Sequence, residues 1–179
     1  MRELVDRARL DRFLDELGRR VRVPTRFYLV GGASAVVEGW RGATVDVDFA
    51  AEPDTRELFE ALPDLKNRLD LSCEPASPAH FVPELPGWRE RSVWIRSAGQ
   101  LQVYHYDFTS QLLAKIERGH GQDLTDVQHM LDDGRVDPAT ALELFDRVEP
   151  ELVRYPAIEP AAYRAKVEAI LGPLLEGGP

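Results

Sequence analysis

Two aspartates separated by one residue are the clearest indication of chemistry in this chain. Asp46 and Asp48 alternate with Val45, Val47 and Phe49. On a strand, alternate residues share a face, so the two carboxylates would lie side by side and the apolar residues would face the core. Neighbouring carboxylates repel each other, and a Mg²⁺ ion, which takes oxygen ligands, would relieve that repulsion. The pattern predicts a magnesium site; the alternative is a solvated strand whose aspartates have no function.

A glycine pair precedes the aspartates and predicts a place for phosphate. Residues 27–30 are aromatic and aliphatic, as in a buried strand, and Gly31 and Gly32 then break that strand. Residues 33–38 suit a short helix, and a helix that begins after glycines offers backbone N–H groups to a phosphate. Phosphate-binding backbone and metal-binding carboxylates are therefore expected within one strand–helix–strand unit.

These residues resemble the DNA polymerase β-like nucleotidyltransferase superfamily. Its signature is a hydrophobic strand, Gly-Gly or Gly-Ser, a spacer, and then Asp-h-Asp/Glu-h, where h is apolar. Here 13 residues separate Gly32 from Asp46. The run Arg41-x-x-Thr44-x-Asp46-x-Asp48 is similar to the bacterial branch that includes the AbiEii-type toxins. Gly32 stands where serine is commoner, which removes a hydroxyl but leaves the backbone groups in place.

A second stretch supports the same branch. Lys115 and the pair Asp123 and Asp126 resemble its "L-x-x-K … (R/K)-D-x-x-D" segment, with Gln122 where a basic residue often stands. The resemblance implies that Lys115 contacts nucleotide phosphates and that Asp123 has a role in the site, as a helix cap or as an electrostatic partner. Without the resemblance, Lys115 would be interpreted as a solvated helix residue. The similarity extends over roughly residues 25–132.

The superfamily often places a third carboxylate on a neighbouring strand, as a metal ligand or general base. Residues 67–74 predict such a strand, with Asp70, Ser72 and Glu74 on one face. Asp70 is the first candidate and Glu74 the second. A polar strand face without function is the alternative, and several members of the toxin branch have no obvious third carboxylate.

The sequence predicts an α/β (α+β) fold in one compact unit of 179 residues, of which 44% are apolar. We expect residues 1–106 to form a minimal nucleotidyltransferase core, with an N-terminal helix and a short mixed sheet. Residues 107–179 are expected to form a helical layer packed on it. Expected helices are 3–17, 33–38, one capped by Asp54, 108–118, one from Asp123, 138–148 and 160–175; residues 90–96 and 101–106 should form a hairpin.

Composition limits the partners and the compartment. A net charge of −9 argues against a general electrostatic grip on nucleic acid but not against a local basic patch. No apolar run is long enough for a membrane span, and the charged N-terminus has no secretory signal pattern. The single cysteine fits a reducing compartment. We expect a cytoplasmic protein without a membrane partner.

The resemblance implies a Mg²⁺-dependent nucleotidyltransferase that uses one or two metal ions. It would move a nucleoside monophosphate from a nucleoside triphosphate to a hydroxyl of an RNA end, such as that of a tRNA, or of a protein. Arg41, Thr44 and Lys115 are the expected polar contacts of the nucleotide. A toxin-like protein would have an antitoxin partner. Two alternatives are a nucleotide-binding module that has lost its chemistry and an interaction protein with no nucleotide site.

Overall fold

The structure, a computed structural model, describes residues 3–177 and groups them into two compact units. Unit 1 runs to Ser77 and resumes over Ser92–Tyr106, whereas unit 2 comprises Pro78–Arg91 and the chain from Asp107 onward. Residues 78–91, which we expected in the core, belong instead to the helical unit.

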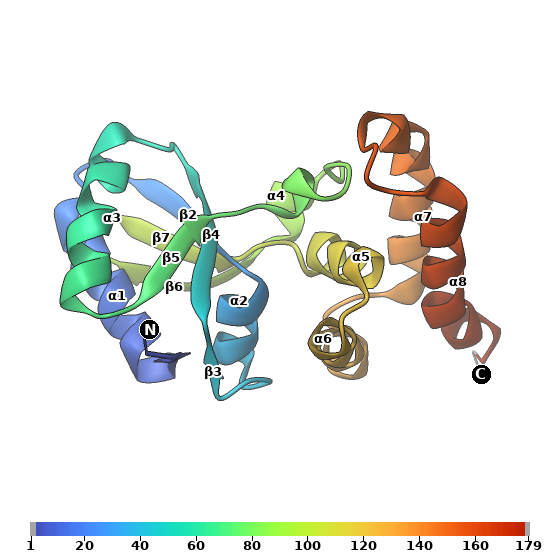
Figure 1. Cartoon of the computed structure of the whole chain (residues 1–179), viewed down its shortest axis with the longest axis horizontal. Coiled ribbons are helices and arrows are strands. Elements are labelled where there is room, and N and C mark those ends of the chain that lie inside the picture. The colour runs from blue at the N-terminus through green and yellow to red at the C-terminus, as the bar shows by residue number, and fades with distance from the viewer. Residues whose placement is uncertain (1–2, 178–179) are drawn as a thin grey trace. The chain divides into compact units, whose positions relative to one another are not determined.

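Unit 1 contains a mixed five-stranded sheet in the order β5-β4-β2-β7-β6 (Figure 1). β2 pairs antiparallel with β4 and parallel with β7; β4–β5 is parallel and β6–β7 is an antiparallel hairpin. A separate two-stranded sheet joins β1 to β3. The strands are β1 (Val5–Asp6), β2 (Thr25–Val30), β3 (Ala43–Thr44), β4 (Asp46–Glu52), β5 (Ser72–Pro75), β6 (Val93–Ala98) and β7 (Leu101–His105).

One face of the sheet carries the core of unit 1. Helices α1 (Arg7–Arg20) and α3 (Arg56–Arg68) pack against this face and against each other (Figure 1). Phe27 on β2 and Phe49 on β4 stack with ring centroids 4.6 Å apart, and Phe13 of α1 contacts Phe27. The short helix α2 (Gly31–Glu38) follows β2 directly and also contributes to this core.

The predicted alternation in β4 is correct from Asp46 onward. Val47 and Phe49 are buried, and Asp46 and Asp48 are half-buried on the opposite face. Val45 was expected to face the core but is 64% exposed. The strand begins only at Asp46, so the alternation does not extend to the residue before it.

Several element boundaries differ from the predictions because side chains other than the expected ones cap the helices. Asp6 caps α1 by accepting a hydrogen bond from the Arg9 backbone, so the helix starts at residue 7 rather than 3. Thr55, and not Asp54, caps α3. Residues 90–91 are the end of a short helix, so the hairpin begins later than expected.

The strand predicted over residues 67–74 is the largest error. Residues up to Arg68 complete the last turn of α3, and Asp70 has a left-handed φ of 47°. Extended pairing starts only at Ser72. A left-handed residue cannot continue a strand, so Asp70 lies outside β5.

Unit 2 is helical. It comprises α4 (Trp88–Arg91), α5 (Phe108–Arg118), α6 (Gly121–Asp132), α7 (Pro138–Val148) and α8 (Pro160–Glu176), with 3₁₀ turns η1 (Pro78–His80) and η2 (Glu149–Arg154). The predicted bounds of α5 and α7 are correct, whereas α6 starts two residues before Asp123. Asp107 caps α5 through two backbone N–H groups and also accepts both arms of the Arg91 guanidinium.

Helix α8 is joined to α5 and α7 through one aromatic residue. The hydroxyl of Tyr163 donates a hydrogen bond of 2.8 Å to the carbonyl of Leu113, and its ring meets that of Phe145 edge to face at 5.0 Å. Together the two units make a mixed α+β protein, as predicted. In residues 3–177 no helix combines the length and apolar character that a membrane span requires.

Candidate functional site

The pairing of β2 with β4 places the aspartates beside the start of α2. Val30, the last residue of β2, is the register partner of Asp48, and α2 begins at the next residue. Asp46 and Asp48 lie on the sheet face opposite Phe49, away from the apolar core. The sequence motif thus folds into one local arrangement: strand, helix start and carboxylates.

The first turn of α2 approaches the Asp48 carboxylate without an intervening side chain. Gly31 has a φ of 58°, a conformation that favours glycine, and Val30, the residue before it, makes no side-chain cap hydrogen bond. A Cβ added to Gly31 would be 3.5 Å from Oδ2 of Asp48. The positive end of the helix dipole therefore lies close to the Asp48 carboxylate and stabilises its negative charge.

Gly32 is required because the side chain of Thr44 occupies the adjoining space. A Cβ on Gly32 would lie 2.1 Å from Oγ1 and 2.9 Å from Cβ of Thr44, and 3.3 Å from Nη1 of Arg41. The serine that is commoner in the resembling superfamily would not fit beside this threonine. The structure therefore brings Gly32, Arg41 and Thr44, three of the predicted nucleotide contacts, to one point.

Thr44 is held in place from both sides. It is buried in β3, where it is the register partner of Val5 in β1. Its hydroxyl donates a hydrogen bond of 3.1 Å to the backbone carbonyl of Asp46. The same side chain thus contacts the start of α2 and fixes the backbone at the first aspartate.

Glu74, the second candidate for the third carboxylate, lies nearer to the pair in register than Asp70 does. In the parallel pairing of β4 with β5, Asp48 is the partner of Glu74 and Asp46 that of Ser72. Asp70 precedes β5 in a left-handed turn. The register therefore makes Glu74 the sheet neighbour of Asp48.

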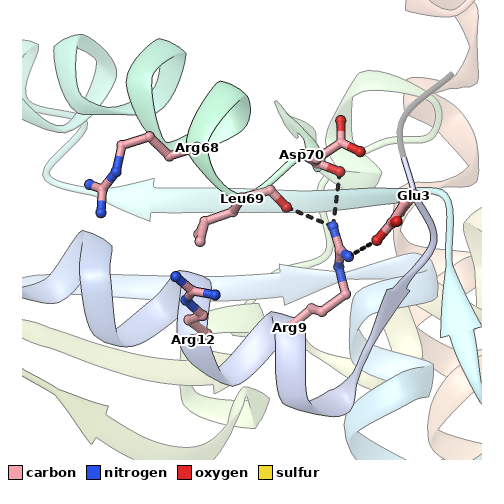
Figure 2. Close-up of a pocket in the computed structure, with 6 residues that line it drawn as sticks. All are labelled: Glu3, Arg9, Arg12, Arg68, Leu69 and Asp70. Carbon is pink, nitrogen blue, oxygen red and sulfur yellow. Dashed lines mark hydrogen bonds and ion pairs between the residues drawn. The ribbon is translucent and has the colours of Figure 1, made fainter.

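Asp70 instead lines a cavity of about 270 Å³ between α1 and the end of α3 (Figure 2). Arg9 ties this region together: its guanidinium donates hydrogen bonds to the carbonyls of Leu69 and Asp70, at 2.6 and 3.0 Å, and forms an ion pair with Glu3. These contacts connect the first turns of α1 to the turn that leads into β5. The backbone of Asp70 thus has a structural role that the sequence pattern does not indicate.

The chemistry of Asp46 and Asp48 fits Mg²⁺ if phosphate supplies the remaining ligands. Among residues 3–177, no three or more His, Cys, Asp or Glu side chains converge to hold a metal ion. Mg²⁺ is commonly bound by one or two carboxylates together with substrate phosphates and water, rather than by a complete protein cage. Two half-buried carboxylates near the start of a helix match that description.

Lys115 and Asp123 meet in unit 2, in a buried ionic cluster. The Lys115 ammonium donates to Oδ1 of Asp123 at 3.2 Å and to Oδ2 of Asp126 at 2.7 Å. Arg118 donates two hydrogen bonds to the Asp123 carboxylate. Lys115, Asp123 and Asp126 are each less than 5% exposed. Interpreting Lys115 as a solvated helix residue is therefore incorrect, and an electrostatic partnership with Asp123 is present.

Asp126 also belongs to this cluster, although the resemblance favoured a role for Asp123 over one for Asp126. It is fully buried and makes the shorter contact with Lys115. The signal was available: residues three apart on a helix share a face, so a lysine that reaches Asp123 can also reach Asp126.

The charge state of Asp123 follows from the balance within this cluster. Burial alone raises the pKa of the carboxyl, but the hydrogen bonds and positive charges of Arg118 and Lys115 outweigh it. The pKa therefore lies below its ordinary value of 3.8. At neutral pH the carboxylate is ionised.

Comparison with known proteins gives one match. A family model described as nucleotidyltransferase of unknown function (DUF6036) matches residues 8–164, a span that covers most of both units. The chain belongs to this family. No curated protein and no solved structure matches the chain. The family assignment agrees with the prediction of a nucleotidyltransferase. The matched span includes the paired aspartates, the glycine pair and the lysine cluster.

The fit between Gly32 and Thr44 can be tested with a double-mutant cycle. Gly32→Ala should lower the free energy of unfolding by about 1–3 kcal/mol, because the added methyl group overlaps Thr44. In a Thr44→Ala background the same change should cost clearly less, since the closest clashing atom is gone. Urea unfolding of the four proteins gives the coupling energy.

Gly42→Ala is the matched control, because nothing lies within 4 Å of a Cβ at that position. It should leave stability unchanged or slightly raised. Equal costs for Gly32→Ala and Gly42→Ala would show that Thr44 does not exclude a side chain at residue 32.

Removing the Lys115 charge should destabilise unit 2. Lys115→Met leaves two buried carboxylates without their shared cation, and we expect a loss of about 3–5 kcal/mol in the free energy of unfolding. Lys66→Met is the control. Lys66 is half-buried in α3 and forms no ion pair within residues 3–177, so its replacement should change the free energy of unfolding by no more than about 0.5 kcal/mol. Similar losses for the two variants would contradict a structural role of the cluster.

The lowered pKa of Asp123 predicts part of the acid sensitivity. Its stabilising effect is complete above the carboxyl's ordinary pKa of 3.8 and is lost as the pH falls through the lower folded pKa. Stability of Asp123→Asn should therefore decline less steeply than that of the wild type below about pH 4. Urea unfolding between neutral and acidic pH measures this, and parallel curves would refute the prediction.

Proposed function

We propose that this protein is a Mg²⁺-dependent nucleotidyltransferase whose nucleotide site is formed by the start of α2 and the first residues of β4. The observation that carries the proposal is the register of β2 with β4, which sets the Asp48 carboxylate beside Gly31. The proposal assigns the carboxylate to the metal ion and the backbone of the glycines to the phosphate. Membership of a nucleotidyltransferase family supports the same reaction class.

The residues of unit 1 around the start of α2 and along β4 and β5 have different roles in the proposed reaction. The backbone N–H groups of Gly31 and Gly32 bind the triphosphate, and Arg41 and Thr44 add a guanidinium and a hydroxyl beside Gly32. Asp46 and Asp48 hold one or two Mg²⁺ ions, which would neutralise phosphate charge and favour the ionised acceptor hydroxyl. Glu74, the register partner of Asp48, is the first choice for a general base.

The proposed reaction is a displacement at the α-phosphorus. An oxygen of the acceptor hydroxyl forms a bond to the α-phosphorus while the bond between the α-phosphorus and the bridging oxygen breaks, which releases pyrophosphate. The hydroxyl proton passes to Glu74 or to solvent. The products are a nucleotidylated acceptor and pyrophosphate.

Lys115 enters the proposal as a phosphate contact. An ammonium group has three N–H donors, and two of those of Lys115 are directed at Asp123 and Asp126. In the proposal, the third donates to a phosphate oxygen. The two aspartates would fix the direction of this donor, so that Lys115 needs little reordering when it binds a ligand.

The acceptor is an RNA end or a protein side chain, and a similarity to the AbiEii branch would add an antitoxin partner. The net charge of −9 favours an acceptor or partner that does not depend on a general electrostatic attraction to phosphate. Transfer from an α-³²P-labelled triphosphate to tRNA, or to proteins of a lysate, distinguishes the two acceptor classes.

The decisive experiment measures by calorimetry whether ATP, GTP, CTP and UTP bind, each with and without Mg²⁺. We expect one or more nucleotides to bind with Mg²⁺ and binding to be lost in Asp46→Asn/Asp48→Asn. The control is Asp54→Asn/Glu84→Gln, which removes two exposed carboxylates that form no ion pair within residues 3–177. It should bind nucleotide as the wild type does. Failure of the wild type to bind any of the four would remove the proposal.

A second candidate function is a nucleotide-binding module without transfer activity. It is favoured by the observation that no third carboxylate joins Asp46 and Asp48 in a metal-binding group within the described chain. It predicts the same binding but no label transfer to any acceptor and no pyrophosphate release. An active enzyme would release pyrophosphate in proportion to transferred label.

A further inference from the structure

A chain of three buried polar side chains joins α2 to β7. His105, the last residue of β7, is 3% exposed and lies between two residues of α2. Its Nδ1 is 2.7 Å from Oγ of Ser34, and its Nε2 is 2.9 Å from Oε1 of Glu38. Ser34 is 1% exposed and the Glu38 side chain 10% exposed, so the whole chain is nearly removed from water.

The chemistry fixes how the imidazole bonds. Nε2 faces a carboxylate, which only accepts, so Nε2 must carry a proton and donate it to Glu38. Nδ1 then accepts from the Ser34 hydroxyl in the neutral ring or donates to that oxygen in the imidazolium. Both contacts survive in either charge state, which makes the connection between the strand and the helix independent of protonation.

Helix α2 is short, and the side chains that it buries are small. It is eight residues long, and its buried residues are Ala33, Ser34, Ala35 and Val36. Ser34 and Glu38 are four residues apart and therefore share one face of the helix. One imidazole that binds both fixes that face along a full turn.

His105 is also joined to the strand from which α2 emerges. In the parallel pairing of β2 with β7, it is the register partner of Leu29, two residues before Gly31. The end of β7 thus contacts β2 through backbone pairing and α2 through the imidazole of His105. An error in the direction of α2 would displace the N–H groups of Gly31 and Gly32.

We infer that His105 is a positioning residue: through Ser34 and Glu38 it fixes the direction of α2 and thereby holds the Gly31–Gly32 backbone where it can bind phosphate. The phosphate-binding part of this inference rests on the proposed function. The Ser34–His105–Glu38 chain does not touch the substrate and takes no part in the reaction itself.

Hydrogen exchange tests the positioning of α2 without any ligand. In His105→Asn, which retains a nitrogen near the Nδ1 position but cannot reach Glu38, the amides of residues 31–38 should exchange about tenfold faster or more, the scale on which loss of a hydrogen bond to a charged group acts. Ser34→Ala should have a similar effect. Leu65→Ala is the control: it opens a cavity in α3 of the same unit and leaves α2 residues unchanged. Exchange in residues 31–38 that matches the control would overturn the inference.

Nucleotide affinity then tests the consequence. In conditions where every variant is fully folded, the affinity for the Mg²⁺–nucleotide complex that the wild type prefers should fall about tenfold or more in His105→Asn, but not in Leu65→Ala. Equal affinities for the two variants, with the wild type binding normally, would refute a positioning role and leave the proposed function intact. Failure of the wild type to bind would instead remove the proposed function, and the exchange rates of residues 31–38 would still decide whether His105 holds α2.

Discussion

The antiparallel register of β2 with β4 is the constraint on which the candidate site depends. Because side chains alternate along a strand, a shift of one residue would turn Asp46 and Asp48 toward the core and expose Phe49. The Phe27–Phe49 stack, buried under α1 and α3, makes that shift costly. Apolar packing on one face of the sheet therefore determines where the two carboxylates lie on the other.

Close approach and charge act together around α2. Gly32 has no side chain because Thr44 fills the space, and Thr44 in turn holds the backbone at Asp46 and pairs with β1. The helix end brings positive partial charge toward Asp48. Residues of β1 and β3 thus support the arrangement of the start of α2 beside β4.

The two aspartate pairs of this protein are stabilised in different ways. Asp123 and Asp126 have their cations within unit 2, Lys115 and Arg118, and the resulting cluster is a buried, mutually satisfied network. Asp46 and Asp48 lie half-buried beside the start of a helix. The first arrangement suits a framework that directs one lysine N–H, and the second suits the binding of a cation with its phosphate.

The sequence by itself determined the local part of this result. Alternation identified β4, the glycine pair identified the strand-to-helix transition, and the resemblance of residues 112–126 to a family segment indicated a partnership of Lys115 with Asp123. Each of these signals is carried by residues close together in the chain. The fold class and the family follow from the same signals. Capping was less predictable: Thr55 competed with Asp54, and only the backbone geometry decided between them.

Tertiary structure alone decided the contacts between distant segments. The register of β5 on β4 brings Glu74, and not Asp70, beside Asp48, because the turn after α3 uses a left-handed residue and delays the strand. His105 lies 71 residues from Ser34, so no spacing rule connects them, and only the parallel pairing of β2 with β7 brings the imidazole to α2. Such contacts depend on strand order and register, which are set by the burial of the whole apolar core rather than by any short pattern.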